Sequence, residues 1–378
     1  MSLSIFRASV LGFAVLLSAC AGSEKTERAA AEEYAPEPDE EDEVSIAESG
    51  VTFEEVAEAL ITQATPDENV DSPASWRAPG GATWVIATAK ATDRLVVYDG
   101  DTGATLRIVG GSGGGAGEFN RPNGVFVIDD LVFVVERDNR RVQALRLPEF
   151  TPLGSFGTQE LEKPYGLWVR RHEDGYEVLV SDAYMSADDE DAPPPLTELD
   201  RRFKRYQAKV EQDELRGTLL GTFGATDAAG AIRIPESIWG DEAHARLLIS
   251  EEDQSLGTRL RVYGMDGNYA GRDLGAGVFH AQAEGMALWQ CADGSGYWIA
   301  TDQYKDRSVF HVFDRISLER VGAFAGRKTA NTDGVWLQQG ATNAFPRGVF
   351  YAVDDDQAVA AFDWRHIAAA LKLREHCG

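Results

Sequence analysis

The sequence predicts an all-β fold, a six-bladed β-propeller, preceded by a short N-terminal helix and a disordered acidic tether. After residue 66, short β-rich runs such as 83–89 and 94–98 are separated by Asp/Gly turns such as 99–103. Runs of this form recur at about 40 to 50 residues, the period of propeller blades. Strands do not alternate with helices, which argues against a parallel α/β sheet. Dividing about 300 residues by this period gives six blades; seven blades and a β-sandwich are the alternatives.

Residues 1–19 have the form of a signal peptide. Arg7 precedes an apolar stretch, residues 8–17, that is too short to span a bilayer as a permanent helix. Leu17-Ser18-Ala19-Cys20 resembles the lipobox of bacterial lipoproteins, and this resemblance implies lipidation of Cys20 and localisation at the bacterial cell envelope, on the outer membrane. Two or more acyl chains on one residue would give stable membrane anchoring. The alternative is an ordinary signal peptide with a chance cysteine.

Residues 20–50 are predicted to form a disordered linker behind the lipidated cysteine. The segment is rich in Glu, Asp, Ala and Pro and includes the charge block 37–43. It has too few large apolar side chains to offset the entropy of ordering. Residues 51–65 place Phe53, Val56, Leu60 and Ile61 at helical spacing, so a lead-in helix is expected there. The propeller is expected over residues 66–374.

The composition excludes several classes of function. The formal net charge is −26, only part of which lies in the linker, so the folded part is acidic too. Nucleic-acid binding would need stripes of Lys and Arg, and no P-loop, Cys-x-x-Cys or His-Glu-x-x-His motif occurs. An acidic surface is compatible with divalent cations, which prefer oxygen ligands. We expect a monomer that contacts the membrane only through its lipid anchor.

Three further features remain open or carry little chemistry. Cys291 and Cys377 would be able to form a disulfide in an oxidising exterior, or remain two separate thiols. Residues 185–199 combine acids with Pro193-Pro194-Pro195 and read as an exposed loop. Residues 199–223 would fit a basic helix, but a long strand hairpin is the preferred interpretation.

One blade resembles the NHL repeat of propeller proteins. Residues 117–127 contain a Pro-Asn-Gly turn that leads into a strand, and 138–143 read Asp-Asn-Arg-Arg-Val-Gln. Lys163-Pro164-Tyr165-Gly166 starts a similar unit. The resemblance supports the propeller and says little about its chemistry.

Several segments, taken in order along residues 71–371, resemble the β-propeller phytases, calcium-dependent enzymes that release phosphate from inositol hexakisphosphate. The motifs that carry the resemblance are Asp71-Ser72-Pro73-Ala74-Ser75-Trp76, Pro235-Glu236-Ser237-Ile238, Leu247 to Asp253, Ala283-Glu284-Gly285-Met286, Ala300-Thr301-Asp302-Gln303, Asn331-Thr332-Asp333-Gly334 and Phe345-Pro346-Arg347-Gly348. Each motif is weak alone, but their order matches that of the family.

The resemblance implies a calcium site and a set of phosphate-binding residues. The implied metal ligands are Asp71, Glu236, Glu251, Glu284, Gln303 and Asp333. Glu252 is the alternative to Glu251 at this strand end. The implied catalytic and phosphate-binding residues are Glu236, Glu284, Lys90, Arg137 and Tyr165. The residues themselves agree with a site: carboxylates at strand ends that gather at a channel mouth repel one another unless cations lie between them. The substrate implied is inositol hexakisphosphate or a related phosphomonoester.

The chain also departs from the family pattern. Where the family has a lysine and a glutamate after the strand at residues 177–180, this chain has Asp182-Ala183-Tyr184, and Ser72 replaces a second aspartate. Both losses remove groups that would hold phosphate or metal. The alternative function is therefore a non-catalytic, NHL-like propeller lipoprotein that binds partners at the envelope. A calcium-dependent lactonase is a third hypothesis.

Overall fold

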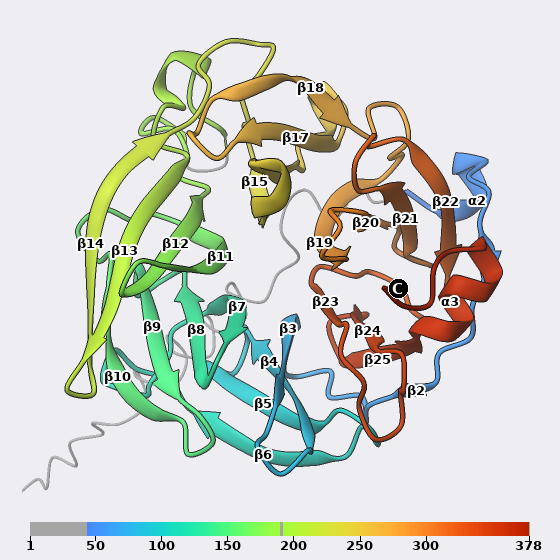
Figure 1. Cartoon of the computed structure of the whole chain (residues 1–378). Coiled ribbons are helices and arrows are strands. Elements are labelled where there is room, and N and C mark those ends of the chain that lie inside the picture. Colours follow the sequence, from blue (N-terminus) through green and yellow to red (C-terminus); the bar gives the residue numbers. More distant parts are fainter. Residues whose placement is uncertain (1–43, 190–191, 378) are drawn as a thin grey trace, which may run out of the picture. The chain divides into compact units, whose positions relative to one another are not determined.

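The computed structural model describes residues 44–189 and 192–377, and in this part of the chain six sheets of mainly antiparallel strands form a closed ring (Figure 1). The six-bladed propeller predicted from the sequence is confirmed. Each sheet is one blade, and the innermost strand of each blade contacts the innermost strands of the two neighbouring blades. The predicted signal peptide, Cys20 and most of the tether lie outside the described residues.

The blades follow one another along the chain, each from its inner to its outer strand. Blade 1 consists of β3 Val70–Arg77, β4 Thr83–Ala89, β5 Arg94–Asp99 and β6 Thr105–Gly110. Blade 2 consists of β7 Pro122–Ile128, β8 Leu131–Glu136, β9 Arg141–Arg146 and β10 Thr151–Phe156. Blade 3 consists of β11 Pro164–His172, β12 Gly175–Asp182, β13 Phe203–Glu211 and β14 Glu214–Phe223. Blade 4 consists of β15 Pro235–Asp241, β16 Arg246–Glu251, β17 Arg259–Gly264 and β18 Tyr269–Leu274. Blade 5 consists of β19 Gln282–Gln290, β20 Gly296–Gln303, β21 Val309–Asp314 and β22 Arg320–Ala325. Blade 6 contains β23 Val335–Gln338, β24 Val349–Asp354 and β25 Ala358–Asp363. The hairpin preferred for residues 199–223 is formed by β13 and β14.

The N-terminal part of the described chain closes the ring, and here two expectations were wrong. Residues 51–65 contain two short strands, β1 Glu54–Glu55 and β2 Leu60–Ile61, and the short helix lies earlier, at α2 Ile46–Ser49. Strand β1 pairs with β22 of blade 5, and β2 pairs with β25 as the outer strand of blade 6. Exposed edges favour strand pairing over an isolated helix, because the paired edge satisfies backbone groups. Residues 44–50, expected to be solvated linker, begin this belt: Val44 and Ile46 pack on blade 5.

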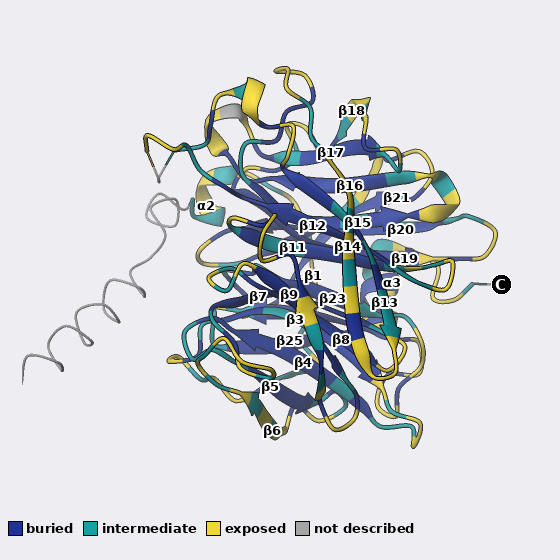
Figure 2. Cartoon of the chain, turned by 90° about the vertical axis from the view of Figure 1, so that its left-hand side faces the viewer, coloured by how far each residue is buried: buried dark blue, intermediate teal, exposed yellow. Residues whose placement is uncertain are grey.

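The core fills the spaces between blades, where the strands are almost wholly buried (Figure 2). Trp289 and Trp298 are fully buried, as expected for core residues. The C-terminal helix α3 Trp364–Leu371 packs on this core through Trp364 and Ile367. Three short 3₁₀ turns lie in connections, at Leu196–Glu198, Glu242–His244 and Gln254–Leu256. No helix of residues 44–189 and 192–377 has the length and apolarity that a membrane crossing needs.

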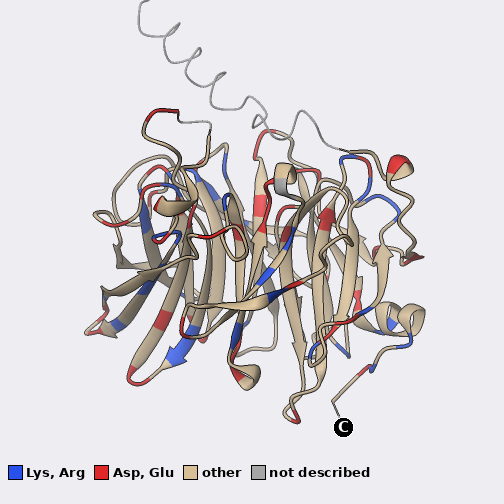
Figure 3. Cartoon of the chain, turned by 90° about the horizontal axis from the view of Figure 1, so that it is seen from above, with Lys and Arg blue, Asp and Glu red and all other residues tan. Residues whose placement is uncertain are grey.

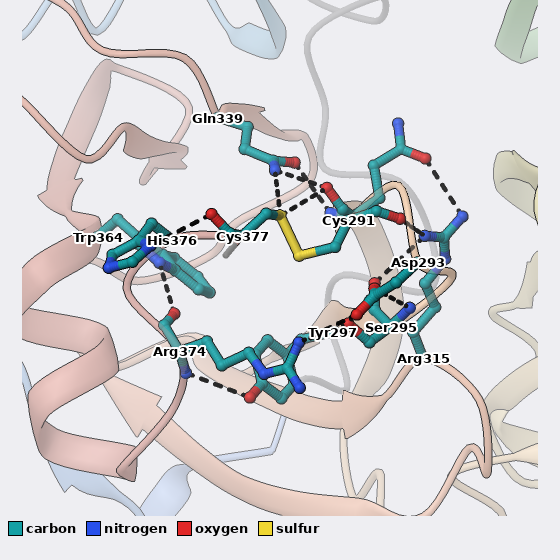
Figure 4. The surroundings of a disulfide bond; sticks show 11 residues. Cys291, Asp293, Ser295, Tyr297, Arg315, Gln339, Trp364, Arg374, His376 and Cys377 are labelled. Atoms are coloured by element: carbon teal, nitrogen blue, oxygen red, sulfur yellow. Dashed lines mark hydrogen bonds and ion pairs between the residues drawn. A yellow bond between two sulfur atoms is a disulfide. The ribbon is translucent and has the colours of Figure 1, made fainter.

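A disulfide joins Cys291 and Cys377 and fixes the C-terminus to blade 5, which answers a question that the sequence left open (Figure 4). The Cα atoms are 5.4 Å apart, and the residues are separated by 86 positions. Arg374 adds a second attachment, since its backbone N–H donates to the Tyr297 hydroxyl. The tail is therefore held at two points.

We expect the double variant Cys291→Ser/Cys377→Ser to lose about 2–3 kcal/mol of unfolding free energy, because a long loop is no longer closed in the unfolded chain. Urea denaturation of the variant, compared with the native protein before and after reduction, measures the loss. Reduction of the native protein should reproduce the effect of the variant. Equal midpoints for the native protein and the variant would contradict this expectation.

Candidate active site

Each inner strand places one side chain at the mouth of the central channel. In β3, β7, β11, β15 and β19 the pairing register shifts near the start of the strand, and a bulge of two residues opens there. The first residue of each bulge, and the residue at the same place before β23, form a set that we call the mouth ring: Asp71, Asn123, Tyr165, Glu236, Glu284 and Asp333. Bulges commonly redirect side chains next to functional sites.

The spacing of the mouth ring is set by close contact between neighbouring backbones. A Cβ atom at Gly166 would lie 2.6 Å from the carbonyl oxygen of Glu236, and one at Gly285 would lie 2.5 Å from that of Asp333. The N–H of Gly285 donates to this Asp333 carbonyl at 2.8 Å. Glycine is needed at these positions because only a residue without a side chain permits such an approach. Adjacent blades therefore hold their ring residues in direct register.

Below the mouth ring the channel is narrow and closed. A cavity of about 50 Å³ is lined by the inner strands, including Phe126, Trp239 and Trp336. These three rings come from blades 2, 4 and 6 and contact one another with centroids 5.0–5.4 Å apart. A ligand at the mouth ring therefore meets an aromatic floor and not an open pore.

Lys90 provides a positive charge inside the acidic ring. It follows β4, is almost completely buried, and its Nζ lies 3.0 Å from Asp71 Oδ1 and 3.3 Å from Asp333 Oδ2. Tyr165 donates its hydroxyl to the same Asp71 oxygen at 3.3 Å. The structure thus brings together four residues that the sequence had placed in one site. Lys90 bridges carboxylates of blades 1 and 6, which lessens their mutual repulsion.

Glu236 and Glu284 come from neighbouring blades and lie close enough for their negative charges to repel each other. Burial and the neighbouring charge of Glu284 raise the pKa of Glu236 well above its ordinary value. Glu236 also shares a hydrogen bond with Glu252, which in turn accepts from Gln282 Nε2 at 2.9 Å. Burial likewise raises the pKa of Asp333, although Lys90 opposes the rise. Carboxyl groups forced together in this way can hold a proton or a cation between them.

These pKa shifts predict how the stability of the cation-free protein depends on pH. The raised pKa of Glu236 means that the folded state favours the protonated carboxyl. The contribution of Glu236 to the free energy of unfolding is therefore complete below pH 4.5 and is lost as the pH rises through the higher pKa of the folded state. In EDTA, the gain in Tm of Glu236→Gln over the native protein should therefore grow above pH 4.5. Thermal melts at several pH values measure this difference, and a difference that shrinks with pH would contradict the sign.

The structure gives Glu251 a different role from the expected metal ligand. Its carboxylate accepts backbone N–H groups of Arg233 at 2.8 Å and Ile234 at 3.0 Å, so it fixes the loop that leads into β15. Asp182 does the same for the loop before β11 and pairs with Lys204. The acid that hydrogen-bonds to the ring residue Glu236 is Glu252, the next residue along the chain.

This strand-end carboxylate is a repeated structural device. Five blades carry it at the end of the second strand, where it accepts backbone N–H groups of the loop before the inner strand: Glu136, Asp182, Glu251, Asp302 and Asp354. The residue that follows this carboxylate occupies the same position in its blade that Lys90 occupies in blade 1. In that register blade 2 has Arg137, blade 4 has Glu252 and blade 5 has Gln303.

The remaining predicted residues, Gln303 and Arg137, lie at the ends of the second strands of blades 5 and 2. Figure 3 shows acidic and basic positions mixed along the connections. Gln303 is buried and donates through Nε2 to Asp333 Oδ1 at 2.9 Å, so it belongs to the ring network. Arg137 is partly exposed and ion-paired with Asp138 at 2.7 Å. An exposed guanidinium at the rim could reach an anion that enters from solvent.

The donor types of the mouth ring fit a hard divalent cation. Four carboxylates face the channel, and the side chain of Asn123, although fully buried, has no hydrogen-bond partner at either Oδ1 or Nδ2. Carboxylate and amide oxygens are the ligands that calcium prefers. Within residues 44–189 and 192–377, however, no three acidic, histidine or cysteine side chains are already gathered as a metal-binding group. Instead, Lys90 lies between the carboxylates of Asp71 and Asp333.

The fold and the ring define a propeller with an acidic, closed-ended channel mouth. Residues 232–368 match the model of the Phytase family, so the resemblance found in the sequence is confirmed over that stretch. The match contains Glu236, Glu252, Glu284, Gln303 and Asp333. It does not reach Asp71, Lys90, Arg137 or Tyr165, whose roles remain predictions from the resemblance in the sequence.

Solved structures share the fold at low sequence identity. A protein of unknown function from Bacteroides thetaiotaomicron VPI-5482 is 12% identical, with a TM-score of 0.50 over 83% of this chain and 73% of that one. A calcium-binding protein, regucalcin, from Agrobacterium tumefaciens str. C58 is 12% identical, with a TM-score of 0.50 over 82% of this chain and 95% of that one. No curated protein matches the chain. At this identity the neighbours support the propeller alone.

Proposed function

We propose that the protein is a calcium-dependent phosphohydrolase of the phytase type, acting at the mouth ring on inositol hexakisphosphate or a related phosphomonoester. The observation that carries the proposal is the set of carboxylates from blades 1, 4, 5 and 6 at one channel mouth, three of them buried and Asp333 partly buried, with raised pKa values at Glu236 and Asp333. The phytase match over residues 232–368 supports the same chemistry.

The chain's own residues would divide the work. Glu236, Glu284, Asp71 and Asp333 would hold calcium, with Gln303 and Glu252 completing the oxygen set. Bound calcium would neutralise phosphate oxygens and lower the pKa of a nucleophilic water. Lys90, Tyr165 and Arg137 would donate hydrogen bonds to the phosphate ester. For Lys90 this means exchanging its contact with Asp71 or Asp333 for the substrate.

Phosphate release tests the proposal directly. The purified protein should release inorganic phosphate from inositol hexakisphosphate when calcium is present, and EDTA should stop the reaction. Phosphate esters of smaller alcohols form the comparison panel. Absence of release from every ester, with calcium-saturated and folded protein, would overturn the enzymatic proposal.

A second candidate, a non-catalytic propeller that binds a partner at the envelope, is favoured by two observations. The family's lysine and glutamate are replaced in this chain by Asp182-Ala183-Tyr184, and Lys90 already pairs with two ring carboxylates. In that case Glu236→Ala and Glu284→Ala would leave the cellular role intact. Under either candidate we propose anchoring at the outer membrane through Cys20, and metabolic labelling with a radioactive fatty acid tests this against a Cys20→Ser variant.

A further inference from the structure

A second pocket lies between blades 3 and 4, outside the mouth ring. The long connection between β12 and β13 runs beside blade 4 (Figure 1, upper left). Together they enclose a cavity of about 590 Å³. This volume is within the range that binds small organic ligands, about 300–1,000 Å³. None of the residues assigned to the mouth ring lines the cavity.

One wall of the pocket is apolar. It consists of residues 192–196, which read Ala-Pro-Pro-Pro-Leu, and Ala228 and Ala231 lie in the lining as well. Pro194 and Ala231 are buried, whereas Ala228 is exposed. Proline walls lose little entropy when a ligand packs on them, because the ring has almost no rotamer freedom to lose. This side of the pocket therefore suits an apolar or aromatic group.

The other wall carries guanidinium groups. Arg233 is partly exposed, with its side chain 28% accessible, and pairs with Asp253 at 2.9 Å. Arg261 is 4% exposed; its Nη1 contacts Asp273 at 2.9 Å and the Ala229 carbonyl at 2.7 Å. Its Nε is buried and has no acceptor. Arg233 is the more accessible of the two guanidinium groups, and together the two positive charges make this wall suitable for an anionic group.

We propose that this pocket binds a small anion that carries an apolar group, such as an aryl or alkyl phosphonate, phosphate ester or carboxylate. The anionic group would lie at Arg233 and Arg261, and the apolar group would pack on residues 192–196. Neither half alone matches the pocket: a bare inorganic anion leaves the proline wall in contact with water, and an uncharged apolar molecule leaves the arginines without a new partner. This proposal is independent of hydrolysis at the mouth ring.

Calorimetric titration of the full protein in EDTA tests the proposal with three probes. Phenylphosphonate, which carries both groups and has no ester bond to hydrolyse, should bind saturably. Methylphosphonate and benzyl alcohol, which each present one group, should bind at least roughly tenfold more weakly. Equal binding of phenylphosphonate and methylphosphonate, or no saturable binding of phenylphosphonate, would overturn the proposal.

Variants locate the binding site. Arg233→Gln should weaken phenylphosphonate binding roughly tenfold, and Ala228→Trp should abolish it by filling the cavity from an exposed position. Arg146→Gln, which alters an exposed ion-paired arginine away from the pocket, is the matched control and should not change the affinity. Binding that survives Ala228→Trp but disappears in Glu284→Gln would place the ligand at the mouth ring and refute the second pocket. Phosphate release by Ala228→Trp reports separately on the proposed hydrolase.

Discussion

Glu236→Gln is expected to reduce calcium-dependent phosphate release by at least about 100-fold and, at the same time, to raise the Tm of the protein in EDTA at pH 7. Both effects come from one carboxylate. In the folded protein Glu236 is buried beside Glu284 and has a pKa well above its ordinary value. The ionised carboxylate therefore destabilises the cation-free protein, but the same carboxylate is needed to bind calcium.

The opposite signs separate a catalytic role from a structural one. A residue needed only for folding would lose activity and stability together, whereas glutamine keeps the size of the side chain and removes the repulsion. The Tm increase that calcium produces in the native protein should shrink in the variant, because ligand binding to the folded state is weakened. Glu319→Gln, which alters an exposed glutamate on the β21–β22 connection, is the matched control. Full activity in Glu236→Gln would refute the site.

Gly285→Ala is expected to lower the free energy of unfolding by about 4 kcal/mol, above the 1–3 kcal/mol usual for overpacking. The new Cβ would lie 2.5 Å from the Asp333 carbonyl oxygen and 2.9 Å from the Val335 backbone nitrogen. Both are backbone atoms of the next blade, so no side-chain rotation relieves the clash. Blades 5 and 6 would have to separate at the mouth ring, and calcium binding should weaken with the loss of register.

Gly221→Ala supplies the control for this experiment. Gly221 lies in β14, and a Cβ there would meet no atom within 4 Å. Urea denaturation should place Gly221→Ala close to the native midpoint and Gly285→Ala far below it. Similar midpoints for the two variants would show that the close approach between blades 5 and 6 does not constrain the ring.

The fold was accessible from the sequence because the blades repeat a local pattern of strands and Asp/Gly turns. The belt over residues 44–61 was not, since its strands are only two residues long and Phe53, Val56 and Leu60 are also spaced as in a helix. Their partners, β22 and β25, lie more than 260 residues away, and no local pattern reports such pairing.

The site was accessible only in part. Resemblance pointed to Glu236, Glu284 and Asp333, which the structure brings to the mouth ring. For the end of β16 the sequence left Glu251 or Glu252 open and Glu251 was chosen, whereas the structure shows Glu252 hydrogen-bonded to the ring residue Glu236. A repeated signal was present: an acid ends the second strand in five blades, so Glu251 matches Glu136 and Asp302 and the site residue is the next one. Asn123 was not predicted as a site residue. Its Pro-Asn-Gly sequence stands at the same position of its blade as Pro-Glu-Ser at residues 235–237, so Asn123 corresponds to Glu236.

The most direct test of the account is a crystal structure with calcium and inorganic phosphate, using anomalous scattering to locate the ions. The account predicts calcium at the mouth ring, coordinated by Glu236 and Glu284 together with Asp71 or Asp333, and phosphate near Lys90. Calcium bound only away from these carboxylates, with Lys90 still paired to Asp71 and Asp333, would contradict it.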